Sequence, residues 1–181
     1  MNQEILERRL AELPLYLYAW LGPEELPFSQ RVQAVCRQEC PRYGRSWSCP
    51  PAVGTVAECR ARCLTYDGAL LVVTVQETQA AELDELLATK PFHTAQMQAI
   101  QECFAAQGCQ TLCLSGDACS RCPDCSWPGG PCRHPEQMMP CLEGYGVVVS
   151  ELAERFGVPF VPEPGLVYWY GLVLYRDGAE V

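Results

Sequence analysis

The sequence lacks the usual marks of a secreted or membrane-spanning protein. No window approaches about 18 uninterrupted apolar residues, and the N-terminal segment is charged and amphipathic, without the apolar run of a signal peptide. Nothing in its 181 residues is composed like a linker, so we expect one domain over residues 1–181. The net charge of −9 argues against non-specific binding to nucleic acid or to an anionic membrane, although it would suit a basic patch on a protein partner.

The familiar signatures of catalysis are also missing. The sequence has no Walker motif, no GxGxxG after a strand, no nucleophile elbow, no HExxH and no convincing Ser/His/Asp set. Only two histidines are present, His93 and His134, which excludes extensive imidazole ligation of a metal. Chemistry would have to come from a metal centre or a partner, so we expect a metal-binding or redox protein rather than a stand-alone enzyme.

Cysteine, by contrast, is abundant, with 13 residues. The number of cysteines is odd and the N-terminal segment does not look like a signal peptide, so a secreted disulfide scaffold is disfavoured. Metal ligation in a reducing compartment explains the thiols better, and we expect a cytoplasmic protein. Cys103, Cys109 and Cys113 are the exceptions, because they fall at positions that predict core packing.

The stretch ACSRCPDCSWPGGPC holds two CxxC steps back to back, and a Pro-Gly-Gly-Pro turn then brings a fourth sulfur round to the first three. Thiolates at this spacing can cap a compact inorganic cluster, because a loop can turn successive sulfurs inward. Structural zinc sites more often join two CxxC pairs across a longer insert. We therefore favour a [4Fe-4S] cluster, with zinc as the alternative, and the predicted ligands are Cys119, Cys122, Cys125 and Cys132.

Three neighbouring residues are predicted to surround this cluster. Trp127 could shield it from water, which would help to set its potential, or could simply pack the loop. Arg133 and His134 follow Cys132 directly, and a cation there would stabilise the reduced cluster. The alternatives are a solvated surface pair or, for His134, a ligand in a zinc site.

A second cysteine group occupies residues 36–63 with longer and less regular spacers. It is not the CxxxCxxC pattern of radical S-adenosylmethionine enzymes, because Tyr43 stands where the third cysteine would be needed. Cys63 lies one helical turn beyond Cys59, so either could be the fourth ligand, and buried structural thiols are the alternative interpretation. The predicted ligands are Cys36, Cys40, Cys49 and Cys59.

The rest of the chain predicts an α/β fold, with α+β possible, in which helices flank a small mixed sheet and two cysteine-rich loops occupy residues 36–63 and 117–141. Continuous or alternating apolar runs predict strands, and apolar residues at helical spacing predict helices. Residues 69–75 and 110–115, with helices between them, suggest a crossover that joins two parallel strands. The cysteine loop begins where the second strand ends, and open α/β sheets bind ligands beyond such ends. The predicted strands are 15–20, 69–75, 110–115 and 166–175, with a possible extended segment at 28–35. The predicted helices are 3–13, one marked by Leu83, Leu86 and Leu87 that ends before Pro91, one marked by Met97, Ile100 and Phe104 that ends near Gly108, and 148–156.

CPRYGRSWSCPP in the first half, with CSRCPDCSWPGGPCRHPE and the following GYGVVV in the second, resembles the predicted metal-binding family known as domain of unknown function 2284. The resemblance spans nearly the whole chain and implies a cytosolic iron-sulfur protein of no known reaction. By this resemblance, the four loop cysteines match the ferredoxin-like motif of the family, and Cys36, Cys40 and Cys49 match its other cysteine motif, in the first half of the chain. The family pattern usually has a serine at Cys141, and Cys59 and Cys63 are less regular, so the fourth ligand of that site stays open.

Three functions follow. The first, which we predict, is an electron-transfer protein that binds two [4Fe-4S] clusters and meets a redox protein partner. The second is an enzyme or activating factor in which the less regular site has three cysteine ligands and one open iron. The third is a zinc-stabilised interaction protein. The sequence indicates neither the partner nor the oligomeric state.

Overall fold

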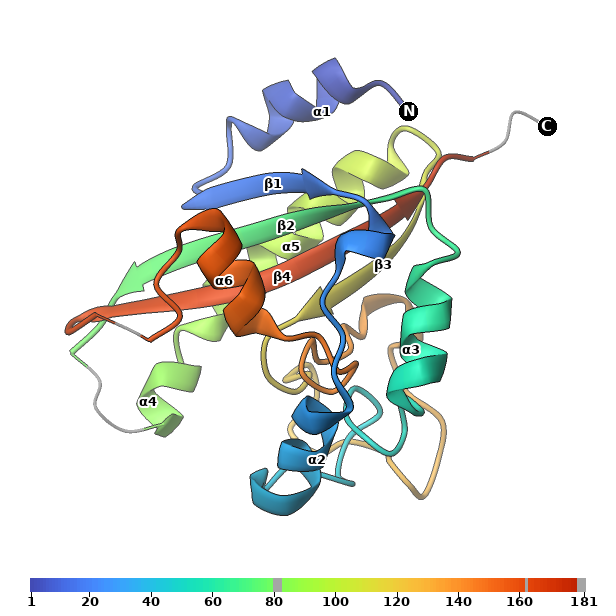
Figure 1. Ribbon diagram of the computed structural model, residues 1–181, viewed down its shortest axis with the longest axis vertical. Coiled ribbons are helices and arrows are strands. Elements are labelled where there is room, and N and C mark those ends of the chain that lie inside the picture. The colour runs from blue at the N-terminus through green and yellow to red at the C-terminus, as the bar shows by residue number, and fades with distance from the viewer. Residues whose placement is uncertain (80–82, 162, 179–181) are drawn as a thin grey trace.

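The computed structural model describes residues 1–79, 83–161 and 163–178, and a four-stranded sheet forms its centre (Figure 1). Every strand pairing in these residues is antiparallel. The longest runs from Gly68↔Tyr175 to Glu77↔Leu166, between the two central strands. In spatial order the strands are β1 (Leu17–Leu21), β2 (Gly68–Glu77), β4 (Leu166–Arg176) and β3 (Gln110–Ser115).

The two central strands are apolar on both faces because helices or loops cover both. Leu71 pairs with Leu172 in one buried cluster, and its neighbour Leu70 pairs with Val173 in the cluster on the opposite face. Side chains alternate between the faces of a strand, so a strand covered on both sides reads as a continuous apolar run. This explains why the run at 69–75 predicted a buried strand correctly.

Helices cover the two faces of the sheet unequally (Figure 1). One face packs against α1 (Gln3–Leu10) and the long α5 (Lys90–Ala105), through residues such as Leu6 and Phe104. The other packs against α6 (Val149–Phe156), which Gly157 ends in a left-handed conformation, and α3 (Val56–Cys63). The remaining helices are α2 (Gln30–Glu39), α4 (Leu83–Leu87), η1 (Pro23–Glu25) and η2 (Pro135–Gln137).

The predicted class, a small sheet flanked by helices, is confirmed in its α+β form, but the sheet is antiparallel rather than mixed. Strands β2 and β3 do run in the same direction, since both pair antiparallel with β4. They are not neighbours, because the C-terminal aromatic strand inserts between them. The possible extended segment at 28–35 is wrong, because Ser29 accepts a hydrogen bond from the Arg31 N–H and caps helix α2.

The cysteine-rich segments gather beyond the end of the sheet where β3 stops, together with α2 and α3 (Figure 1). Two isolated bridges, Phe28↔Val147 and Ser115↔Cys141, join these segments to one another and to β3. In the part of the chain that the structure describes, no helix has the length and apolar character needed to cross a membrane.

Candidate metal centres

The four cysteines of the loop line one small cavity. Each is half-buried, whereas the residues between them from Ser120 to Asp124 are exposed, apart from Cys122 itself. The four thiols therefore face one cavity, while most of the side chains between them are exposed. We call this group, Cys119, Cys122, Cys125 and Cys132, the loop site.

Hydrogen bonds close the turn that returns the fourth cysteine. The Gly130 N–H donates to the Ser126 carbonyl at 2.9 Å, and the Ser126 hydroxyl donates to the Pro131 carbonyl at 2.6 Å. From the other cysteine-rich segment, the Trp47 indole N–H donates to the Gly130 carbonyl at 3.0 Å. The Pro-Gly-Gly-Pro turn is thus held by its own residues and by a residue distant in sequence.

Cys125 has the environment of a thiolate. Burial raises the pKa of its thiol, but the backbone N–H groups of Trp127 and Trp47, the Ser46 side chain and the charge of Arg133 lower it, and the net pKa is lowered. The Trp47 N–H lies 3.5 Å from the sulfur. Hydrogen bonds of this kind stabilise negative charge on sulfur and tune the potential of a bound cluster.

The structure brings two of the three predicted surrounding residues to the same cavity. Arg133 and His134 line it together with Arg121. Trp127 packs edge-on against Trp47, with ring centroids 4.6 Å apart, and Trp47 is the indole that lines the cavity. Trp47 was missed because it lies far from the loop in sequence, although it sits inside the SWSCPP motif.

The second cysteine group opens onto a larger cavity of about 620 Å³. Cys36 lies on α2 and Cys40 caps its C-terminus, and both line this cavity. Cys141, from the far end of the loop region, lines it as well. The opposite wall is aromatic and consists of Phe160, Tyr168, Trp169 and Tyr170.

Cys49 belongs to the same group but is buried. It is buried in one small cluster with Ala118 and Cys141, and the Cys141 thiol donates to the Glu143 carboxylate at 3.0 Å. Interaction with the Cys141 thiol lowers the pKa of Cys49 to about 7, while interaction with Cys49, burial and Glu143 raise the pKa of Cys141. Burial, then the charges of Cys40, Glu143 and Cys49, raise the pKa of Cys36 to about 11. Cys49 therefore lies near both Cys141 and Cys36.

Cys59 and Cys63 lie elsewhere. They sit one turn apart on α3, both with no exposed surface, in the apolar cluster that also contains Leu71. The Cys59 thiol donates to the Val53 carbonyl at 3.4 Å. Burial raises the pKa of these thiols to about 11 and about 12, respectively. The structure does not bring either to the cavity of Cys36 and Cys40. Cys109 and Cys113 are buried and Cys103 partly buried in the other core cluster, as predicted.

The two cysteine groups share Ser48 as a common wall. Its hydroxyl accepts the Cys119 N–H at 2.8 Å, and its carbonyl accepts the Cys141 N–H at 2.8 Å. It also directly precedes Cys49 in the chain. A single buried residue thus contacts both groups, which makes them neighbours in space.

The donor set of both groups is thiol-rich, which suits iron-sulfur clusters or zinc. In a four-iron cluster each thiolate binds a different iron, so cysteines arranged around a cavity fit this cofactor. Within the described ranges, no three cysteine, histidine or acidic side chains converge as a site for one metal ion.

The chain also matches a known family. The family model of the predicted metal-binding protein DUF2284 matches residues 19–175, which include every cysteine of both groups. The chain belongs to the DUF2284 family. No curated protein and no solved structure matches it. The family assignment confirms the resemblance seen in the sequence and supports metal binding, and it names neither the metal nor a reaction.

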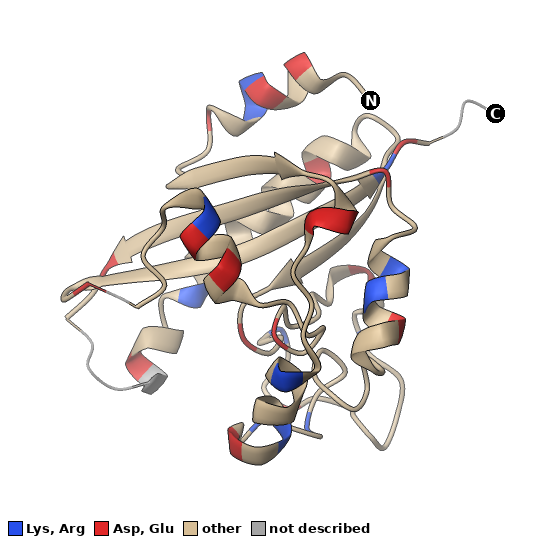
Figure 2. Cartoon of the chain, viewed as in Figure 1, with Lys and Arg blue, Asp and Glu red and all other residues tan. Residues whose placement is uncertain are grey.

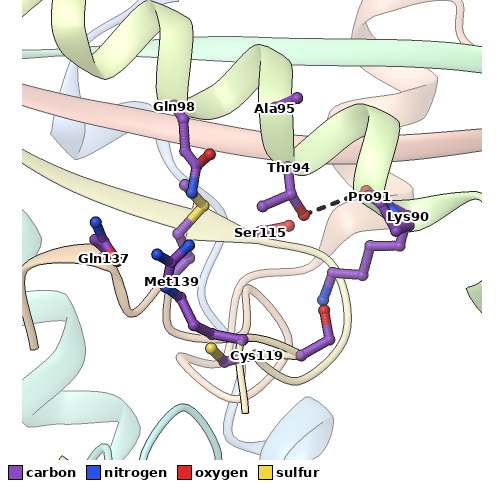
Figure 3. A pocket seen from close by; sticks show the side chains of 11 residues that line it. Lys90, Pro91, Thr94, Ala95, Gln98, Ser115, Cys119, Gln137 and Met139 are labelled. Carbon is purple, nitrogen blue, oxygen red and sulfur yellow. Dashed lines mark hydrogen bonds between the residues drawn. The ribbon is translucent and has the colours of Figure 1, made fainter. Parts of the chain in front are cut away.

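This DUF2284 protein also has a buried cation between its cysteine groups. Lys90, at the start of α5, is 4% exposed; its ammonium donates to the Ala118 carbonyl at 2.6 Å and lies 3.9 Å from the Asp117 carboxylate. Burial lowers the pKa of Lys90, while the charges of Asp117, Cys141 and Cys119 oppose the shift. Figure 3 shows the adjoining pocket, where Lys90 extends from α5 toward the loop that carries Cys119.

Proposed function

We propose that this protein binds two [4Fe-4S] clusters and transfers single electrons to or from a redox protein partner in the cytoplasm. The observation that carries the proposal is the loop site, whose four cysteines line one cavity. Family membership supports the metal-binding character of the chain. A bound cubane would supply one-electron chemistry at a low potential, on the order of −400 mV by analogy with ferredoxins.

The residues of the chain have distinct tasks in this proposal. The loop thiolates bind the cluster, and the backbone N–H groups near Cys125 stabilise charge on sulfur. Trp47 lines the cavity, where its indole would limit the access of water. Cationic side chains lie on α2, on α3 and in the loops (Figure 2), and Arg121 and Arg133 line the cavity itself, where they offset the negative charge of a reduced cluster.

The first test is the metal content of protein purified without oxygen. About eight irons and eight sulfides per chain, with visible absorption that bleaches on reduction with dithionite, are expected for two cubanes. About four irons would confine the proposal to one site. Zinc without sulfide or a visible band would overturn the redox function and select the zinc-stabilised interaction protein.

A variant tests the loop site directly. Cys122→Ser should remove about four irons per chain, because thiolate is the preferred ligand of these clusters. Cys103→Ser is the matched control, since Cys103 is a similarly half-buried cysteine that lies outside both groups. Unchanged iron in the Cys122 variant would refute the loop site.

The larger cavity favours a second candidate function, that of an enzyme or activating factor. Its volume of about 620 Å³ falls within the range of small-molecule sites, and three cysteines open onto its aromatic wall. An iron that lacks one thiolate could bind a substrate there. Added cyanide would then shift the electron paramagnetic resonance signal of one cluster, whereas fully thiolate-ligated clusters would not respond.

A further inference from the structure

We propose that Cys141 is the fourth ligand of the second cluster, together with Cys36, Cys40 and Cys49. We call these four residues the pocket site. The inference rests on the proposed function in one respect, namely that the bound metal is an iron-sulfur cluster. It replaces Cys59, which sequence spacing suggested, with a cysteine from a segment that no local motif connects to the other three.

The backbone fixes Cys141 beside Cys49. The Cys141 N–H donates to the Ser48 carbonyl at 2.8 Å, and an isolated bridge pairs Cys141 with Ser115 at the end of β3. The two thiols are therefore anchored to the same short segment. Both side chains are buried in one small cluster with Ala118, so the two thiols lie together.

The remaining thiols face the same space. Cys36 and Cys40, one turn apart at the end of α2, line the cavity that Cys141 also lines. Cys141 connects the two halves of the pocket site, because it lines this cavity and is also buried with Cys49 in one cluster. Three thiols, two from α2 and its C-terminus and one from the segment after the loop, thus line one cavity, and Cys49 of the SWSCPP turn is buried beside Cys141.

Cys59 has no comparable access. It is fully buried on the face of α3 that packs into the core, and its thiol donates a hydrogen bond to the Val53 carbonyl. A cluster there would have to displace packed apolar side chains. Cys63 is equally buried in the same cluster.

The contact of Ser48 with both cysteine groups predicts a magnetic interaction that can be measured in addition to the metal content. Because Ser48 contacts both groups, clusters in the two sites would be neighbours. When both are reduced, their unpaired electrons interact and broaden or split the resonance signal. Removal of either cluster would leave the unsplit resonance signal of a single isolated cluster.

The experiment compares Cys141→Ala, Cys59→Ala and Cys113→Ala in the full chain after anaerobic reconstitution. Cys141→Ala should halve the iron, from about eight to about four per chain, and replace the interacting signal by that of one cluster. The two controls, also buried cysteines, should keep all the iron and the interaction. Full iron and an unchanged signal in Cys141→Ala, or halved iron in Cys59→Ala, would overturn the assignment.

Two further measurements keep the result clear. Circular dichroism checks that each variant folds, and Cys141→Ser, which nearly preserves the shape of the side chain, should lose the second cluster or shift its resonance. An unaltered resonance in that variant would also refute Cys141 as a ligand. If the wild type holds zinc instead of iron, the proposed function fails, but zinc per chain in the same variants still tests the four-cysteine set.

Discussion

The sheet and the cysteine-rich end of this molecule are stabilised by different means. In the sheet, the residues of β2 from Gly68 to Thr74 are all buried, and helices or loops cover both faces. At the cysteine-rich end, the residues of the loop site are only half-buried, and the local apolar cluster consists of Cys49, Ala118 and Cys141. We infer that burial folds the sheet without metal, whereas ligation orders the loops.

A cavity in the sheet should give the largest effect, and it should not depend on metal. Leu71→Ala removes a fully buried side chain opposite Leu172 and should lower the free energy of unfolding by about 2–5 kcal/mol. Urea denaturation of the metal-free and metal-loaded proteins measures it. Leu64→Ala, at an exposed position, is the control and should change stability by less than about 0.5 kcal/mol. A similar decrease in the free energy of unfolding in both variants would contradict the inference that burial in the sheet stabilises the fold.

Acid should weaken the sheet through His93, which packs under β4. Burial lowers the pKa of His93 from 6.5 to about 3, with Lys90 adding to the shift. Below about pH 6.5 His93 therefore binds a proton in the unfolded chain but not in the folded chain. The contribution of neutral His93 to the free energy of unfolding is fully present above that pH and is lost as pH falls. The slope approaches about 1.4 kcal/mol per pH unit below pH 6.5, which gives a loss of about 2.3 kcal/mol between pH 6.5 and 4.5.

Denaturation of metal-free protein across this range isolates the effect from metal loss. His93→Gln should flatten the pH dependence, because the amide does not titrate, while Thr74 stays available as its hydrogen-bond partner. A slope that persists unchanged in the variant would show that other groups govern acid stability.

Metal removal should affect the other region. Chelation in the absence of oxygen should reduce the hydrogen-exchange protection of residues 116–148 at least about tenfold, equivalent to about 1.4 kcal/mol, since ligation energy orders such loops. The amides of β2 and β4 should keep their protection, because they bond within the sheet. Equal loss in both regions would mean that the metal holds the whole fold together.

The same contrast explains what the sequence could predict. Apolar runs located the strands well, and β3 spans Gln110–Ser115 as predicted, because burial on both faces leaves a local pattern. Helix α2 was missed because none of its residues is buried, so no apolar stripe reveals it. The pairing of β4 between β2 and β3 was missed because strand order depends on contacts between distant segments.

The two cysteine groups differ in the same way. All four thiols of the loop site lie in one short segment, so their spacing alone predicted that they would meet, and they do line one cavity. The pocket site draws Cys141 from the segment after the loop, through a bridge to β3 that has no local signal. The spacing also offered Cys59, with Cys63 as the alternative, but both lie in the core cluster of the sheet, whereas Cys49 lies with Cys141.

Lys90 should give the smallest effect, and it tests whether the two cysteine groups share one electrostatic environment. Its ammonium is buried between them, so Lys90→Met should lower the potential of both clusters, because a reduced cluster loses a favourable charge. An interaction on the order of 1 kcal/mol corresponds to about 40 mV for one electron. Redox titration followed by electron paramagnetic resonance measures each cluster. Lys90→Arg, which keeps the charge, should restore most of the potential; a shift at only one cluster would place the cation beside that group alone.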